Sequence, residues 1–110
     1  MKRDFSGEVK SLIQKYDEND IKYGKSLNYL LFRNKITEEE IKKELSLCEN
    51  LEFAEKQKRE NETRYLLYFV YSKKRGRAYA LKFNNKIKII TIFPLGRRTL
   101  KKYSKKRFKK

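Results

Sequence analysis

The chain of 110 residues contains no histidine, a single cysteine, one proline and four glycines. Without histidine it lacks the commonest general acid–base side chain, and no Ser–His or Cys–His nucleophile can be built. The lone Cys48 cannot form an internal disulfide, and its place at the apolar edge of a predicted helix indicates core packing rather than nucleophilic or redox chemistry. Hydrolases that depend on a histidine-activated nucleophile are therefore excluded.

Long apolar runs are also missing. No segment approaches the roughly 18 residues needed to span a bilayer, and the start of the chain, MKRDFSGEVK, has no apolar signal-peptide region, so we expect a cytoplasmic location. The nucleotide-binding patterns GxxxxGK[ST] and GxGxxG do not occur, and the second half of the chain offers no carboxylates for a metal. We expect neither a cofactor nor a metal.

Acidic residues stop at Glu62. Residues 1–62 hold 13 Lys or Arg and 14 Asp or Glu, whereas residues 63–110 hold 17 Lys or Arg and no acid, and the net charge of the chain is +16. A nucleotide-biased genome can explain a high lysine content, but it does not explain this asymmetry. Unopposed like charge destabilises a fold, so it indicates a polyanionic partner, which we expect to be RNA. An acidic membrane surface is the rival partner, but no amphipathic helix with a long apolar face accompanies the lysines.

The first half of the chain has helical periodicity. Apolar side chains recur at helical spacing in residues 5–17 and again in residues 26–35, which predicts two helices. Asn19, Asp20 and Gly24 interrupt the pattern between them, so we expect a break there.

A third helix has the clearest start. Thr37 is an N-cap residue, and Glu40 stands three residues later to close a capping box. Ile36 and Ile41 occupy the two positions of a hydrophobic staple. These signals predict a helix over residues 38–48, and the glutamates of its first turn suit the helix dipole better than a metal.

After Asn50 the pattern becomes extended. Short polar turns with Gly or Asn separate β-branched and aromatic segments, and Pro94 ends the last of them, which predicts an antiparallel meander of three or four strands over residues 51–57, 64–72, 77–83 and 87–93. We expect one α+β domain, 1–103, with two or three N-terminal helices on one face of the sheet and the other face free. The segment RRTLKKYSKKRFKK, residues 97–110, is expected to add a short helix or to stay mobile, with residues 104–110 as a basic tail outside the domain.

The last hairpin has two possible registers. A three-residue turn pairs Phe83 with Ile87 and makes Lys82 and Lys88 neighbours, whereas a two-residue turn mixes charged and apolar groups on both faces. We favour the first register. The repulsion between the lysines, a few tenths to about 1 kcal/mol, would be offset by a phosphate bound between them.

Three segments resemble parts of the RelE-superfamily ribonuclease toxins of toxin–antitoxin systems, especially their BrnT-like and related branches. ITEEEIKKEL resembles their second helix, RYLLYFVYSKKRGRAYALKF resembles an arginine-containing strand followed by a "GR" strand, and IITIFPLGRRTLKKY resembles their basic ending on tyrosine. The resemblance spans about residues 25–103. Several such relatives carry a histidine in the segment that matches SLNYLLFRN, and this chain has none.

The resemblance implies a RelE-like fold, a metal-independent endoribonuclease activity and an acidic antitoxin as partner. Cleavage through the 2′-hydroxyl needs proton transfer, for which a lysine or tyrosine of lowered pKa could serve, and positive charge on the transition state. The candidate catalytic residues carried over are Arg64, Arg77, Thr91, Arg97, Arg98 and Tyr103. Four of them also have a plainer explanation: the strand arginines as solvated strand ends, the threonine as an ordinary strand residue and the tyrosine as a helix anchor. Arg97 with Arg98 is the pair that we would defend first.

Further cations are expected to contact RNA phosphate without sequence preference. They are Lys73, Lys74, Arg75, Lys82, Lys88, Lys101, Lys102, Lys105, Lys106 and Arg107. The alternative function is a non-catalytic small basic RNA-binding protein, ribosome-associated or viral, whose sheet aromatics stack on bases. DNA binding by a winged or ribbon motif is a third and weaker hypothesis, because none of the predicted helices carries a basic cluster.

Overall fold

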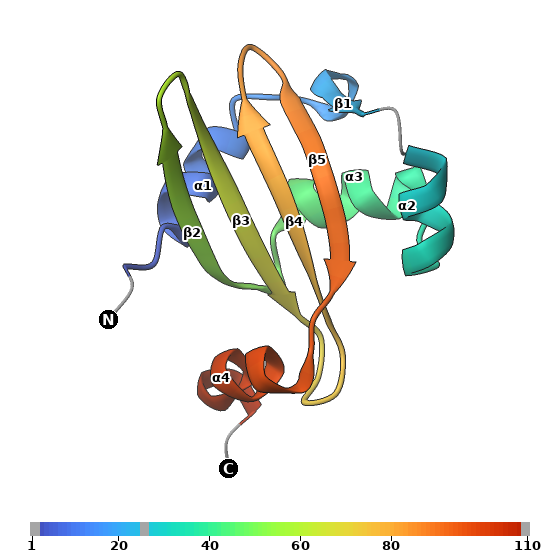
Figure 1. The fold of residues 1–110 in the computed structure, drawn as a ribbon, viewed down its shortest axis with the longest axis vertical. Helices are drawn as coiled ribbons and strands as arrows, with labels where there is room; N and C mark the ends of the chain where they lie inside the picture. The colour runs from blue at the N-terminus through green and yellow to red at the C-terminus, as the bar shows by residue number, and fades with distance from the viewer. Residues whose placement is uncertain (1–2, 25–26, 109–110) are drawn as a thin grey trace.

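The computed structural model describes residues 3–24 and 27–108, and it has an α+β architecture (Figure 1). In chain order the described elements are α1 (Ser6–Ile13), a short 3-10 turn (Glu18–Asp20), β1 (Ile21–Tyr23), α2 (Leu27–Asn34), α3 (Glu38–Leu47), β2 (Leu51–Arg59), β3 (Glu62–Val70), β4 (Gly76–Phe83), β5 (Ile87–Pro94) and α4 (Arg97–Phe108). None of the helices in these two ranges is both long and apolar enough to cross a membrane.

Helix α3 begins with the predicted capping box. The backbone N–H of Glu40 donates to Thr37 Oγ1 at 3.2 Å, and the backbone N–H of Thr37 donates to Glu40 Oε1 at 3.3 Å. Ile36 and Ile41 are both buried, as a hydrophobic staple requires. The helix ends at Cys48, whose thiol is buried and donates to the Leu45 carbonyl oxygen at 3.0 Å. Burial raises the pKa of this thiol, which suits the predicted packing role.

The sheet has the strand order β1-β5-β4-β3-β2. Strands β2 to β5 form the predicted antiparallel meander. The prediction of a purely antiparallel sheet is wrong, because β1 pairs with β5 in parallel and the five-stranded sheet is mixed. A strand of three residues gives almost no periodicity, and its partner lies far away in the sequence, so neither local signal could reveal it.

The favoured register of the last hairpin is confirmed. Phe83 pairs with Ile87, and Lys82 pairs with Lys88. Asn85 takes a positive φ of 60° in the turn, a conformation that asparagine adopts more readily than most residues. The register therefore sends the apolar side chains to one face of the sheet and the two lysines to the other.

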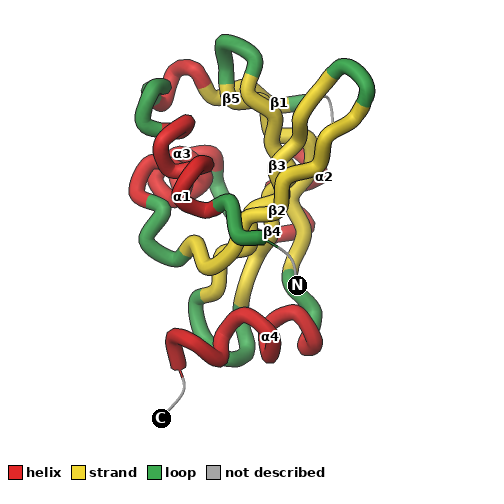
Figure 2. Tube along the Cα trace, turned by 90° about the vertical axis from the view of Figure 1, so that its left-hand side faces the viewer, coloured by secondary structure: helices red, strands yellow, loops and turns green. Residues whose placement is uncertain are grey.

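Helices cover one face of the sheet. Helices α1 and α3 lie together on one side of it (Figure 2), where the largest buried side chains of the strands form the core: Leu67, Phe69, Tyr79, Leu81, Ile87, Ile89 and Ile92. The opposite face, which we call the open face, is uncovered over most of its length. Helix α2 lies beside β5 at the edge of the sheet, and α4 lies across the end where β5 stops (Figure 1).

The basic segment after Pro94 forms α4, which runs through the boundary at residues 103 and 104 where we expected a separate tail to begin. Leu100 is buried, and the Tyr103 ring stacks on Phe53 and Tyr68, with centroids 4.8 and 4.9 Å away. Helix α4 is rich in Lys and Arg, so the reason given against DNA binding, that no helix carries a basic cluster, is wrong.

Candidate nucleic-acid interface

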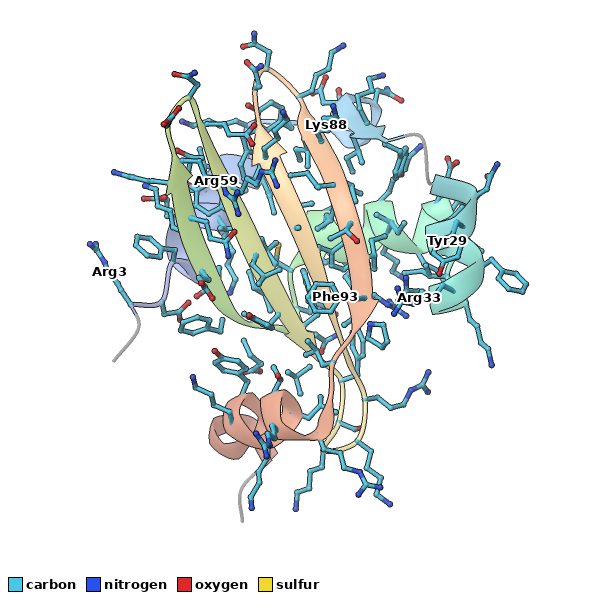
Figure 3. The ribbon with its side chains drawn as sticks, viewed as in Figure 1. Arg3, Tyr29, Arg33, Arg59, Lys88 and Phe93 are labelled. Carbon is cyan, nitrogen blue, oxygen red and sulfur yellow. The ribbon has the colours of Figure 1, made fainter. Side chains whose placement is uncertain are left out.

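Four cations line up across the open face. The register pairs Lys22 of β1 with Lys88 of β5, Lys88 with Lys82 of β4, and Lys82 with Arg64 of β3. Paired residues in a sheet point to the same side, so these four side chains form one row, which we call the cation row. Neighbouring strands lie about 4.8 Å apart, so the row extends over roughly 14 Å. Figure 3 labels Lys88 near the end of the sheet away from α4.

Glu62 binds two members of the row. Arg64 Nη2 lies 2.7 Å from Glu62 Oε1, and Lys82 Nζ lies 3.2 Å from Glu62 Oε2. Hydrogen bonds from Lys82 and Arg64 hold the pKa of the Glu62 carboxyl below its usual range. The repulsion between Lys82 and Lys88 is thus offset by this carboxylate, and it needs no external phosphate. Lys22 and Lys88 are exposed and take part in none of the ion pairs found among the described residues.

Between the cation row and α4 the part of the open face formed by β3, β4 and β5 is largely apolar, and Glu55 of β2 lies at its border, paired with Leu66. Leu66, Ala80 and Thr91 pair across β3, β4 and β5, and Phe93 follows two residues further along β5. We call this strip the apolar lane. Figure 3 shows the Phe93 ring on the open face, with Arg33 of α2 beside it at the edge of the sheet. The lane gives a flat surface on which a planar base could stack.

Helix α4 bounds the lane at its other end. Its described cations are exposed, namely Arg97, Arg98, Lys101 and Lys102. The Tyr103 side chain is occupied by its stack with Phe53 and Tyr68. The side chains of Lys105, Lys106 and Arg107 lie outside the part of the chain whose side chains the structure describes. The open face therefore has basic groups at both ends of an apolar strip.

Arg77 lies on the covered face, in a polar group that we call the Glu44 cluster. Its Nη1 donates to Tyr71 Oη at 3.2 Å and lies 3.5 Å from Glu44 Oε1. Tyr71 and Tyr79 each donate their hydroxyl to the same carboxylate. The Arg77 and Glu44 side chains are only 17% and 13% exposed. This arginine is thus engaged in an internal ion pair between β4 and α3.

The tyrosines whose pKa values are shifted cannot serve as the general base of RNA cleavage, because all of these shifts are upward. Burial, aided in several cases by a nearby carboxylate, raises the pKa of Tyr23, Tyr65, Tyr68, Tyr71 and Tyr79. A phenol with a raised pKa stays protonated at neutral pH, so it can donate a hydrogen bond but cannot accept a proton.

The six candidate catalytic residues do not form one group. Arg64 and Thr91 share the open face, Arg97, Arg98 and Tyr103 lie on α4, and Arg77 lies on the covered face. Of the expected RNA-contacting residues, Lys82 and Lys88 belong to the cation row, while Lys73, Lys74 and Arg75 form the turn between β3 and β4.

The cations of this surface that were not predicted include Lys22 and Arg33. Lys22 was missed because β1 was not recognised, although Ile21 and Tyr23 flank it in the alternation of a strand. Arg33 was missed because nothing in a helical segment tells which distant strand its side chain will approach.

Comparison of the chain with known protein families, with curated proteins and with solved structures finds no match in any of the three.

Proposed function

We propose that the protein binds single-stranded RNA on its open face. The observation that carries the proposal is the alignment of Lys22, Lys88, Lys82 and Arg64 in one row by the strand register. Phosphates would lie along this row and against α4, since Lys and Arg neutralise a nucleic-acid backbone. Bases would lie over the apolar lane, with Phe93 as a stacking platform. An uncovered sheet face suits an unpaired strand, whose bases are free to stack.

The test compares two charge-matched variants in a binding titration with a short single-stranded RNA. Lys22→Gln with Lys88→Gln removes two exposed cations from the row, whereas Lys10→Gln with Lys15→Gln removes two exposed cations from and just after α1. Each phosphate contact contributes about 0.7 to the slope of log K against log salt, so the row variant should lower the slope by roughly 1.4. The α1 variant should change the slope little.

An equal decrease of the salt slope in the two variants would mean that binding depends on net charge alone, and it would contradict an interface on the open face. A duplex DNA of the same sequence serves as competitor. Preference for the duplex, lost when Arg98 and Lys101 are changed to Gln, would favour a DNA-binding role for α4 instead.

A second candidate function is a toxin-like, metal-independent endoribonuclease with a RelE-like fold and an acidic antitoxin as partner. The position of Glu62 favours it, because this carboxylate lies between two cations that could hold a scissile phosphate. Its lowered pKa keeps it ionised at neutral pH, so it could accept the proton of a 2′-hydroxyl, although a lowered pKa also makes it a weak base. Arg64 and Lys82 would stabilise the developing charge.

Incubation of the protein with RNA in EDTA separates the two functions. Discrete cuts that disappear in Glu62→Gln while RNA binding is kept or strengthened would establish an enzyme, since the change removes a negative charge from the row. The Arg97→Ala, Arg98→Ala double variant tests in the same assay whether α4 contributes to cleavage or only to affinity. Absence of cutting by the parent protein leaves the RNA-binding function.

A further inference from the structure

A basic pocket lies at the end of the sheet opposite the cation row. This open pocket of about 220 Å³ is lined by the end of α2, the turn between β3 and β4 and the end of β5. Half of its ten lining residues are basic and none is acidic; the basic ones are Arg33, Lys35, Lys74, Arg75 and Arg77. We call it the basic pocket. It shares no residue with the cation row.

The backbone and the Glu44 cluster fix the walls of this pocket. The Arg75 carbonyl oxygen accepts hydrogen bonds from the backbone N–H groups of Tyr71 and Ser72, at 2.9 and 3.2 Å, and Ser72 Oγ accepts from the Arg75 N–H at 3.1 Å. These bonds close the turn tightly. Arg77 is held from the other side by Tyr71 and Glu44, so its guanidinium is already ordered before any ligand arrives.

The charges of the pocket determine what it can accept. Glu44 balances Arg77, but the other four like charges around this space repel one another, and an anion placed between them relieves the repulsion. A neighbouring pocket of about 360 Å³ shares Tyr71, Arg75 and Arg77 with it, but three acidic residues also contribute to the walls of that pocket, namely Glu40, Glu44 and Glu49. The basic pocket is therefore the better site for an anion.

Size and donor geometry narrow the ligand further. The pocket is open to solvent, and its volume of about 220 Å³ leaves room for a phosphate group. A phosphate monoester carries up to two negative charges and three terminal oxygens, and arginine guanidinium groups bind such oxygens in pairs. We propose that the basic pocket binds the phosphate monoester of a ribonucleotide, either free or at the end of an RNA chain. The second form rests on the proposed RNA binding.

The experiment uses one RNA sequence prepared with a 5′-phosphate, with a 3′-phosphate and with hydroxyl groups at both ends. Binding of adenosine 5′-monophosphate and of inorganic phosphate is measured alongside by calorimetry. One phosphate-terminated RNA should bind about tenfold more tightly than the hydroxyl form, which is the size of one charge-assisted interaction. Arg33→Gln with Arg75→Gln should abolish this difference. The charge-matched control, Lys22→Gln with Lys88→Gln, should weaken all three RNAs and keep the difference.

The outcomes separate the two proposals. Equal affinity for the three RNAs, with binding lost in the row variant, would overturn the phosphate pocket and leave RNA binding on the open face intact. A preference that survives Arg33→Gln with Arg75→Gln would also overturn it, because the phosphate would then bind elsewhere. Nucleotide binding that is lost in the pocket variant, without any RNA binding, would support the pocket and refute the open face. Failure to bind RNA, nucleotide and phosphate alike would refute both.

Discussion

At the scale of single residues, the internal polar contacts are more consequential for stability than the surface cations. Glu44 accepts hydrogen bonds from two tyrosines and pairs with Arg77 while only 13% exposed. Burial of a carboxylate is costly unless a cation pairs with it. Arg77, which the resemblance to ribonuclease toxins suggested as a phosphate ligand, is therefore a structural residue in the first place.

Arg77→Met should be strongly destabilising. Removing one partner of a largely buried ion pair leaves the other partner uncompensated, and such changes cost about 3–5 kcal/mol. Urea unfolding followed by circular dichroism measures the loss. Arg75→Met, at an exposed position two residues earlier, should stay within about 0.5 kcal/mol. A loss of less than about 1 kcal/mol for Arg77→Met would contradict the structural role of the Glu44 cluster.

Two tyrosines offer a matched test of hydroxyl burial. Tyr23 Oη is buried without a hydrogen-bond partner among the described residues, and burial raises the pKa of Tyr23 to about 12. Tyr65 Oη instead donates to Glu8 Oε2 at 2.5 Å. Tyr23→Phe should leave the free energy of unfolding unchanged or raise it by up to about 1 kcal/mol, whereas Tyr65→Phe should lower it by about 1 kcal/mol. Equal effects in urea unfolding would contradict this assignment.

Part of this residue-level arrangement was available from the sequence. Alternation along RAYALKF puts Arg77 on the same side as Tyr79 and Leu81, which are core residues, so its position on the covered face was predictable from β4 alone. Its partner was not, because Glu44 comes from a helix that local patterns cannot dock against a particular strand. The hairpin register was predictable, since only one turn length separates apolar from charged side chains.

At the scale of elements, capping residues and turn residues predicted where helices and strands begin and end, which propensity alone does not. Helix α3 began where Thr37 and Glu40 indicated, and the four strands of the meander began or ended within two residues of the predicted bounds. Strand β1 was not predictable because three residues carry too little pattern. Helix α4 was left open because its many cations conceal the two apolar contacts, Leu100 and Tyr103, that dock it on the sheet.

Thr37→Ala measures the contribution of the capping box. The substitution removes the acceptor for the Glu40 N–H and should lower the free energy of unfolding by about 1 kcal/mol. Ser46→Ala changes an exposed residue of the same helix that does not cap it, so the free energy of unfolding should stay unchanged or rise slightly. Urea unfolding compares the two variants. An equal loss in both would mean that the helix start does not limit the stability of the domain.

At the scale of the whole molecule, the asymmetry of charge along the sequence becomes an asymmetry in space. The acid-free residues, 63–110, supply most of β3, all of β4 and β5, and α4, which together make most of the open face. The glutamates at the start of α3 lie with the helices on the covered side (Figure 2). The topology thus brings Arg64, Lys82 and Lys88, which are spread along the second half of the chain, to one side of the sheet, while Arg77 stays on the other.

This arrangement predicts that salt acts in opposite directions on folding and on RNA binding. With a net charge of +16, the positive charges of the folded protein repel one another. Salt screens this repulsion, because the Debye length shortens from about 10 Å at 0.1 M salt to about 3 Å at 1 M. Raising sodium chloride across this range should therefore stabilise the free protein. A gain of about 1 kcal/mol would raise Tm by roughly 4 °C in a domain of this size. RNA binding should weaken over the same range, because each counterion released from the RNA gains less entropy when the bulk salt concentration is higher.

Thermal unfolding at the two concentrations of sodium chloride, with and without RNA, measures both effects on one protein preparation. At low salt the RNA should raise Tm by neutralising the open face, and at high salt this increment should shrink as the Tm of the free protein rises. Sucrose in place of salt is the control, since it favours the compact state without screening charge. A Tm of the free protein that falls with chloride would contradict the repulsion. An RNA increment that does not depend on salt would contradict binding through the cation row, because phosphate contacts cannot be insensitive to counterions.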